Sequence, residues 1–209
     1  YGLSGADLTP HAYDVLVHNT PISEALRPTD VPNLDLLPTN TQLVGAEIEL
    51  VSAIGRETRL RDSLSQISDT YDYILVDCPP SLGLLTLNAL TAAQTLIVPL
   101  QCEYYALEGL THLLSTVDLV RTHLNTTLTV EGILLTMFDR RNRLSHQVRA
   151  EVESHFADLV FQTTIPRNVR LSESPSFGKP ALLYDITAKG TIAYLDLAGE
   201  VLQRHASTP

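Results

Sequence analysis

The sequence predicts an α/β fold, a doubly wound and mostly parallel sheet with helices on both faces. Short apolar runs, typical of strands covered on both sides, alternate along the chain with longer stretches of helical periodicity. The chain has 209 residues, of which 44% are hydrophobic. That length favours one substantial core over two. We therefore predict a single domain over residues 1–209.

The pattern of residues 1–70 predicts short strands and loops followed by one helix. Residues 1–40 are rich in Pro, Thr and Asn, and the short apolar pieces at 13–17 and 34–37 predict short strands and loops. Between 42 and 67, apolar residues recur among charges at roughly helical spacing. The apolar side of this amphipathic helix is predicted to carry Leu43, Ile48, Val51, Ile54, Leu60, Leu64 and Ile67.

From residue 71 onward, strand and helix patterns alternate. Continuous apolar runs predict strands at 73–77, 95–99, 130–136 and 160–165. Helical periodicity predicts helices at 82–93, 105–123, 145–156 and 190–204. In a doubly wound sheet, ligands bind at the carboxyl ends of the parallel strands. Polar residues that directly follow these strands are therefore the candidates for a site.

Asp77 directly follows the apolar run 73–76 and is the most informative of these residues. A carboxylate there emerges at the ligand-binding edge, where it can hold Mg²⁺ through retained water beside nucleotide phosphates. The alternative is an aspartate that caps the next turn. The following Cys-Pro-Pro-Ser-Leu-Gly segment, residues 78–83, combines rigid prolines with a glycine, as a loop that responds to a phosphate requires.

Composition narrows the classes of function. The formal net charge of −10 argues against coating nucleic acid by overall attraction, so any such contact must be a local basic patch. No apolar run approaches the length of a membrane span. The two cysteines lack CxxC spacing and are interpreted as core residues, and the histidines show no metal or triad spacing.

The segment Tyr71-Asp-Tyr-Ile-Leu-Val-Asp-Cys-Pro-Pro-Ser-Leu-Gly83 resembles the Walker B strand and switch II of ParA/Soj partitioning ATPases, a branch of the deviant-Walker family that includes MinD. Further similar segments follow in the family's order, at 85–90, 99–109, 134–139 and 165–176. The resemblance covers nearly the whole chain. It implies the P-loop NTPase form of the predicted fold.

The resemblance implies ATP and Mg²⁺ as cofactors. It gives Asp77 the catalytic, Mg²⁺-holding role. It also implies that the strand end at Thr136 and Met137 and the loop Pro166, Arg167 and Asn168 flank the adenine. A core-filling role for Met137 is the alternative, since it is the only methionine.

The resemblance also implies partners. Residues Glu103, Tyr104, Tyr105 and Glu108 fall in a segment that faces the second subunit of an ATP-bound homodimer. A ParB/Spo0J-type centromere-binding protein is expected to stimulate hydrolysis, in a cytoplasmic, nucleoid-associated protein that does not use a membrane. A MinD-like membrane-positioning ATPase is a competing reading, but the C-terminal end is short and weakly basic.

Non-specific double-stranded DNA is the other expected partner. The resemblance points to Lys189 and Arg170 as DNA-binding residues. The arginines at 140, 141 and 143 form a second basic cluster after Asp139. That cluster either touches phosphate or caps and solvates the next helix.

No GxxxxGK[ST] or KGGxGK[ST] motif occurs in the sequence. The opening Tyr-Gly-Leu-Ser-Gly resembles the stretch after the family's second strand, so we expect the first strand, the phosphate loop, the first helix and the second strand to lie upstream of residue 1. The 209 residues alone are expected to bind nucleotide weakly. The alternative function is a non-catalytic module that keeps only the partner-binding surfaces.

Overall fold

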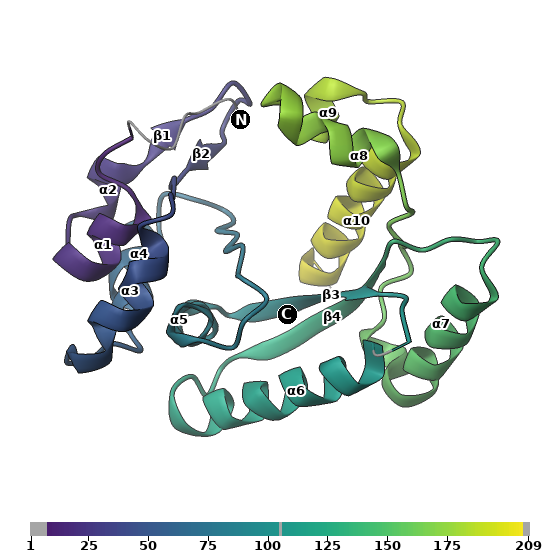
Figure 1. Cartoon of the computed structure of the whole chain (residues 1–209), viewed down its shortest axis with the longest axis horizontal. Coiled ribbons are helices and arrows are strands. Elements are labelled where there is room, and N and C mark those ends of the chain that lie inside the picture. Colours follow the sequence, from purple (N-terminus) through teal and green to yellow (C-terminus); the bar gives the residue numbers. More distant parts are fainter. Residues whose placement is uncertain (1–7, 105, 207–209) are drawn as a thin grey trace. The chain divides into compact units, whose positions relative to one another are not determined.

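A computed structural model describes residues 8–104 and 106–206 of the chain (Figure 1). The chain divides into two compact units. The sheet unit contains Thr95–Thr116 and the chain from Thr129 onward, and the helical unit contains the chain up to Gln94 together with Val117–Leu128. The single-domain prediction stays a prediction.

The sheet unit is built on two parallel strands. Strand β3 (Thr95–Gln101) pairs with β4 (Thr129–Thr136), and α6 (Ala106–His123) connects them. A shift in register between Leu96 and Ile97 leaves Glu131 of β4 without an opposite residue. A parallel pair requires a long crossover, which α6 supplies. The α/β class and the parallel sheet are therefore confirmed.

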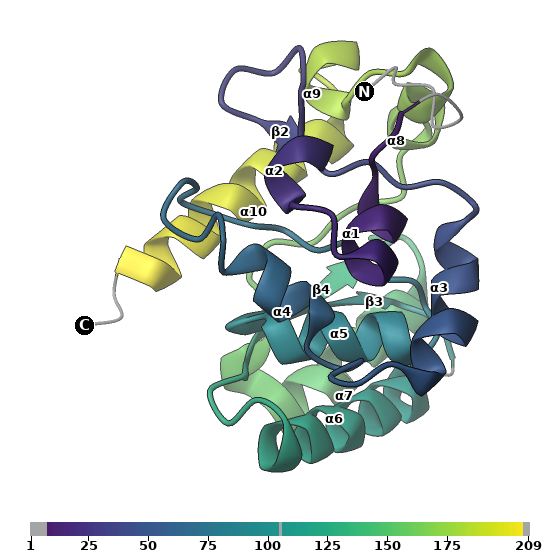
Figure 2. The same ribbon diagram turned by 90° about the vertical axis from the view of Figure 1, so that its left-hand side faces the viewer.

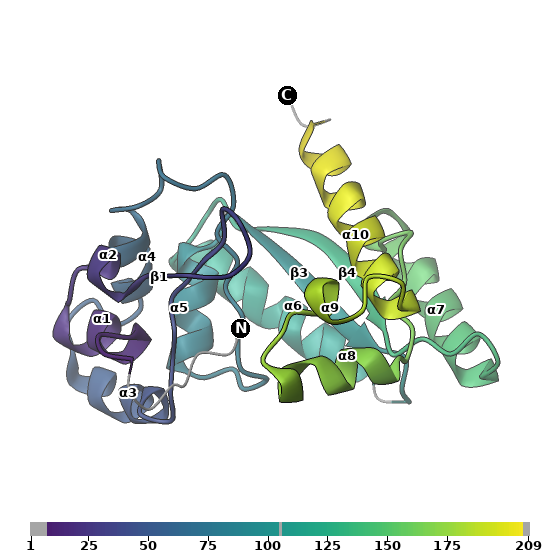
Figure 3. The same ribbon diagram turned by 90° about the horizontal axis from the view of Figure 1, so that it is seen from above.

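Helices cover both faces of this strand pair. On one face, Val98, Leu100, Ile133 and Leu135 pack against α6 and α7 (Arg143–Phe156). On the other face, Ile97 and Leu134 pack against α10 (Lys189–Ala206). Alternate residues of each strand thus face opposite helices, and Figures 1 and 3 show α6 and α10 on opposite sides of the strands. This is the packing that near-continuous apolar strands predict.

The end of the sheet unit is a run of short helices leading to α10. After η2 (Ala157–Leu159) come α8 (Val169–Glu173), η3 (Ser174–Phe177) and α9 (Ala181–Tyr184). Glu200 of α10 accepts hydrogen bonds from the backbone N–H groups of Gln162 (2.8 Å) and Thr163 (2.9 Å). Arg204 lies 4.0 Å from the centre of the Phe161 ring. These contacts fix α10 against the chain that leaves β4.

The helical unit, shown in Figure 2, packs small helices around two apolar clusters. Its elements are α1 (Ala12–His18), α2 (Ile22–Ala25), β1 (Arg27–Pro28), β2 (Asp35–Leu36), α3 (Leu43–Glu49), η1 (Leu50–Ser52), α4 (Arg59–Leu64) and α5 (Leu84–Ala92). Strands β1 and β2 pair antiparallel. Fully buried Asn88 of α5 accepts a hydrogen bond from Leu60 N–H and donates to the Arg56 carbonyl, which ties α4 to α5.

Several sequence predictions are wrong in detail. Residues 13–17 lie in helix α1, and the predicted helix at 42–67 is broken into α3, η1 and α4. Residues 73–77 are not assigned to a strand, and Leu75 is 88% exposed. The predicted strand at 160–165 is reduced to a single bridge between Val160 and Ile133. Cys102 is buried as predicted, but Cys78 is exposed.

Candidate functional site

The strand end at Thr136 and the loop at Pro166 lie side by side in the sheet unit. Ile165 N–H donates to the Leu135 carbonyl (2.9 Å) and Phe138 N–H donates to the Ile165 carbonyl (3.0 Å). Phe138 and Pro166 form a parallel bridge. The structure thus brings together the two segments for which the resemblance implies a place on either side of the adenine.

Met137 stands at the turn between these hydrogen bonds. Its backbone has φ of 54°, in the left-handed region that is uncommon for a side chain of this size. The side chain is 37% exposed, so the alternative that it only fills the core is wrong. Strained backbone is concentrated at functional sites. A partly exposed thioether at the carboxyl end of a parallel strand offers a soft apolar surface to a flat ligand.

Asn168 fixes the loop that lies beside Met137. Its side chain accepts a hydrogen bond from Arg170 N–H (2.9 Å) and so caps the start of α8. A Cβ added at Gly190 would lie 3.1 Å from the Asn168 Cβ and 2.6 Å from Leu171, so α10 approaches this cap closely. The cap and the close approach fix the loop that contains Pro166 and Arg167.

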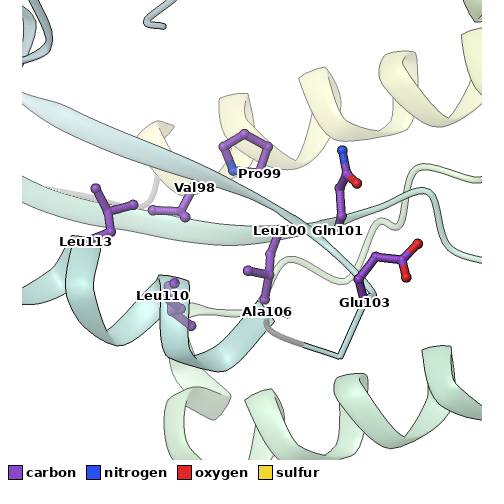
Figure 4. A pocket seen from close by; sticks show the side chains of 9 residues that line it. Val98, Pro99, Leu100, Gln101, Glu103, Ala106, Leu110 and Leu113 are labelled. Carbon is purple, nitrogen blue, oxygen red and sulfur yellow. The ribbon is translucent and has the colours of Figure 1, made fainter. Parts of the chain in front are cut away.

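The segment from Glu103 to Gly109 begins next to the same loop. The Glu103 carboxylate lies 3.9 Å from the Arg167 guanidinium, and both side chains are exposed. Tyr104 and Glu108 are exposed as well, whereas Tyr105 lies outside the described residues. A cavity of about 330 Å³ lies between β3 and the first turns of α6, lined mainly by apolar side chains with Gln101 and Glu103 at one end (Figure 4).

Asp77 belongs to the helical unit. It is exposed and follows the extended apolar segment 73–76. Within the residues that the structure describes, no cluster of His, Cys, Asp or Glu has the arrangement of a metal site. A single exposed carboxylate leaves most positions around an ion to water and substrate oxygens, as Mg²⁺ sites beside phosphates do.

The two predicted DNA-binding residues, Lys189 and Arg170, differ in how free their charges are to contact a phosphate. Lys189 is exposed at the first turn of α10. Arg170 is ion-paired with Glu173 (2.9 Å) and Asp185 (3.5 Å). The hydrogen bond to Glu173 is the main cause that raises the pKa of Arg170 above its usual value. Arg170 is thus partly neutralised by its own neighbours.

The arginine cluster at 140, 141 and 143 differs from Arg170 in its ion pairing. All three residues are exposed on the turn after β4 and at the start of α7. Asn142 caps that helix by accepting from Leu144 N–H, so the arginines are not needed as caps. Across residues 8–104 and 106–206, no carboxylate lies within ion-pair distance of these guanidinium groups. The cluster is an available basic patch.

Sequence reasoning missed one feature. Ile48, Val51 and Ile54 were assigned to the buried side of a helix, but they are exposed. The sequence did contain a sign of this. Ala46 and Leu50 form a second apolar side in the same stretch, and these are the residues that are buried.

Comparison with known proteins identifies close relatives. An AAA domain family model matches residues 1–130. The sporulation initiation inhibitor protein Soj of Bacillus subtilis is 56% identical over 200 residues, which are 96% of this chain and 79% of that protein. The chromosome partitioning protein ParA of Myxococcus xanthus is 54% identical over 203 residues, which are 97% of this chain and 72% of that protein.

Solved structures show the same fold. A cobyrinic acid a,c-diamide synthase from Mycobacterium smegmatis with bound ADP and magnesium superposes with a TM-score of 0.83 at 35% identity, covering 100% of this chain and 77% of that one. An ATP complex of McdA from Cyanothece superposes with a TM-score of 0.85 at 18% identity, covering 97% of this chain and 78% of that one. The second likeness, at this low identity, concerns the fold alone.

Proposed function

Because the chain belongs to the ParA/Soj family, we propose that it acts as an ATPase in chromosome or plasmid partitioning. The observation that carries this proposal is identity above 50% over more than nine-tenths of the chain to two proteins named for sporulation control and chromosome partitioning. The matched stretches span 96% and 97% of the chain.

ATP and Mg²⁺ are the proposed cofactors, in line with the ADP and magnesium bound to the 35% identical diamide synthase. The described residues fit the base end of a nucleotide. Thr136 and Met137 lie beside Pro166 on adjacent backbone, and capped Asn168 fixes the loop. These residues would hold the adenine between a strand end and a rigid loop.

At the phosphate end, Asp77 is the proposed Mg²⁺-holding residue, acting through water. No glycine-rich phosphate-loop motif occurs among the 209 residues. Bound ATP would supply a γ-phosphate, and hydrolysis would remove it, so the protein would exist in an ATP-bound and an ADP-bound state. The prolines and glycine of segment 78–83 suit a loop that changes position between those states.

We propose that ATP brings two copies together through Glu103, Tyr104, Tyr105 and Glu108. The ion pair of Glu103 with Arg167 supports this proposal, because the segment proposed for dimerisation then lies beside the loop proposed for the base. A ParB/Spo0J-type protein is the proposed stimulator of hydrolysis. The protein is proposed to work in the cytoplasm on the nucleoid. Among the described residues, none of the helices has both the length and the hydropathy of a membrane span.

Non-specific double-stranded DNA is the proposed partner of the dimer. The arginine cluster at 140, 141 and 143 is better suited to phosphate than Arg170, because it is exposed and has no carboxylate partner in the described ranges. Lys189 remains a second proposed contact. A local patch of this kind is what an acidic chain needs to bind DNA.

The test uses the native protein, purified from its own cells, with ATP, Mg²⁺ and random-sequence duplex DNA. The proposal predicts Mg²⁺-dependent ATP hydrolysis that rises when DNA and the ParB-type protein are both present. Partner binding that is equal with and without nucleotide, together with absent hydrolysis, would overturn it in favour of a non-catalytic binding module.

A further inference from the structure

The loop that carries the arginine cluster is held by hydrogen bonds from its own residues and from α7. We call residues 139–143 the arginine loop. The Asp139 carboxylate accepts a hydrogen bond from Arg141 N–H (2.9 Å), and the Asp139 carbonyl accepts one from Asn142 N–H (3.0 Å). Asp139 N–H donates to the hydroxyl of buried Ser145 (3.4 Å). These three bonds close the turn around its first residue.

His146 of α7 makes the contact to Arg140. Its Nε2 lies 2.9 Å from the Arg140 carbonyl oxygen. A carbonyl oxygen only accepts, so Nε2 carries a proton and donates it. The imidazole ring also meets the ring of buried Phe138 edge-on, with centres 5.4 Å apart and planes at 80°. His146 therefore joins the core residue before the arginine loop, the loop itself and the start of α7.

The arginines at the start of α7 oppose the helix dipole. The amino-terminal end of a helix carries a partial positive charge, which favours Asp or Glu in the first turn over Lys or Arg. Residues 143–146, the first turn of α7, include no Asp or Glu, and Arg143 is the first residue of the helix. The helix gains no stability from this charge, whereas an anion that approaches the arginine loop would be attracted by both the guanidinium groups and the helix end.

The carboxylates of α7 lie in its second half. Glu151 and Glu153 are about 12–15 Å from Arg143 along the helix, at about 1.5 Å per residue. Glu153 is also ion-paired with Arg149 (2.7 Å). A polyanion would thus meet α7 at its amino-terminal end, where the arginine loop lies.

We propose that His146 positions the arginine loop for the phosphates of duplex DNA. Its hydrogen bond to the Arg140 carbonyl keeps the loop backbone in one conformation before DNA binds. A loop that is already ordered loses less conformational entropy on binding, which strengthens binding without adding a contact. His146 is thus a positioning residue and not a phosphate ligand. This inference rests on the proposed DNA-binding function and adds a residue outside the arginine cluster.

The alternative is that His146 contacts a phosphate itself. Its Nε2 already donates to the Arg140 carbonyl, which argues against that role for this nitrogen. The two roles also differ in their dependence on salt. Each phosphate contact contributes about 0.9 to the slope of log K against log salt, whereas ordering of a loop changes the affinity and leaves the slope as it is.

The test compares His146→Ala and His146→Gln with the parent, by filter binding of the ATP-bound native protein to random-sequence duplex DNA at several salt concentrations. A Gln amide can donate to the Arg140 carbonyl as the imidazole does. Loss of one net hydrogen bond corresponds to about two- to tenfold in an equilibrium constant. We expect His146→Ala to weaken binding by that factor at every salt concentration with the slope unchanged, and His146→Gln to bind within about twofold of the parent.

The matched control is His155→Ala. His155 lies in the last turn of the same helix, and its Nδ1 is 2.9 Å from the Glu151 carbonyl oxygen, a backbone contact of the same length. This variant should keep the parent's affinity and slope. Parent-like affinity of His146→Ala, an equal loss in the control, or no recovery in His146→Gln would overturn the inference. A slope that falls by about 0.9 in His146→Ala would overturn it as well, in favour of a direct phosphate contact.

A second readout uses no DNA. Amide hydrogen exchange reports whether the N–H groups of Arg141 and Asn142 stay bonded to Asp139. We expect exchange at both to accelerate in His146→Ala and to stay parent-like in His146→Gln and His155→Ala. Parent-like exchange in His146→Ala contradicts the positioning role. If the parent itself fails to bind DNA, the proposed DNA partner is wrong, and the exchange result still decides whether His146 orders the loop.

Discussion

Replacing the arginines at 140, 141 and 143 with alanine should weaken DNA binding in a way that depends on salt. Each phosphate contact contributes about 0.9 to the slope of log K against log salt, so three contacts contribute about 2.7. The residues are exposed and lack carboxylate partners in the described ranges, so the full contribution is expected. The assay is filter binding of ATP-bound protein to random-sequence duplex at several salt concentrations.

Two matched variants sharpen this experiment. Arg121→Ala removes an arginine that lies 3.6 Å from Asp118, and it should leave the slope unchanged. Arg170→Ala with Lys189→Ala should change the slope by about 1, because Arg170 is already ion-paired. If the triple variant keeps the parent's slope and the second pair lowers it by about 2, the assignment of DNA contact to the cluster is refuted.

The remaining predictions concern stability, measured by urea unfolding. Glu200→Gln should lower the free energy of unfolding by about 2 kcal/mol at pH 7, since the carboxylate accepts two backbone hydrogen bonds. Burial opposes ionisation of Glu200, but these hydrogen bonds outweigh it and lower the pKa, so the difference should narrow as pH falls below the ordinary 4.5. A constant difference would contradict this. Gly132→Ala should cost about 1–3 kcal/mol, because the new Cβ would lie 2.4 Å from the Phe161 ring; parent-like stability would contradict the packing. Asn88→Ala should cost about 1–3 kcal/mol by leaving half-buried backbone groups unpaired, and a loss under 0.5 kcal/mol would contradict that role.

The long periodic elements were predictable from the sequence. The predicted ranges for β3, β4, α6, α7 and α10 agree with the structure to within a few residues, because each has enough residues to establish its period. The run at 13–17 was wrong because five apolar residues do not distinguish a strand from a helix. The run at 73–77 has the composition of a strand buried on both faces, but the structure leaves it exposed, because composition alone does not provide the covering elements that such a strand requires.

The candidate site was predictable in outline. The candidate roles of Met137 and Asn168 came from the resemblance to the family and not from periodicity, and the structure brings their two segments together through the bridge between Phe138 and Pro166. The left-handed backbone of Met137 has no signal in the sequence. Ion pairing of Arg170 with Asp185 depends on residues fifteen positions apart, so only the fold shows that this arginine is partly neutralised.

Mg²⁺-dependent ATP hydrolysis by the Asp77→Asn variant of the native protein tests the central claim most directly. Asp69→Asn, at a second exposed aspartate nearby in the sequence, is the matched control. The account predicts that the Asp77 variant loses at least a hundredfold in hydrolysis at saturating Mg²⁺, about 2.7 kcal/mol of barrier, while the control keeps the parent's rate. Equal rates in the two variants would contradict the assignment of this chain's Mg²⁺ carboxylate and the ATPase function built on it.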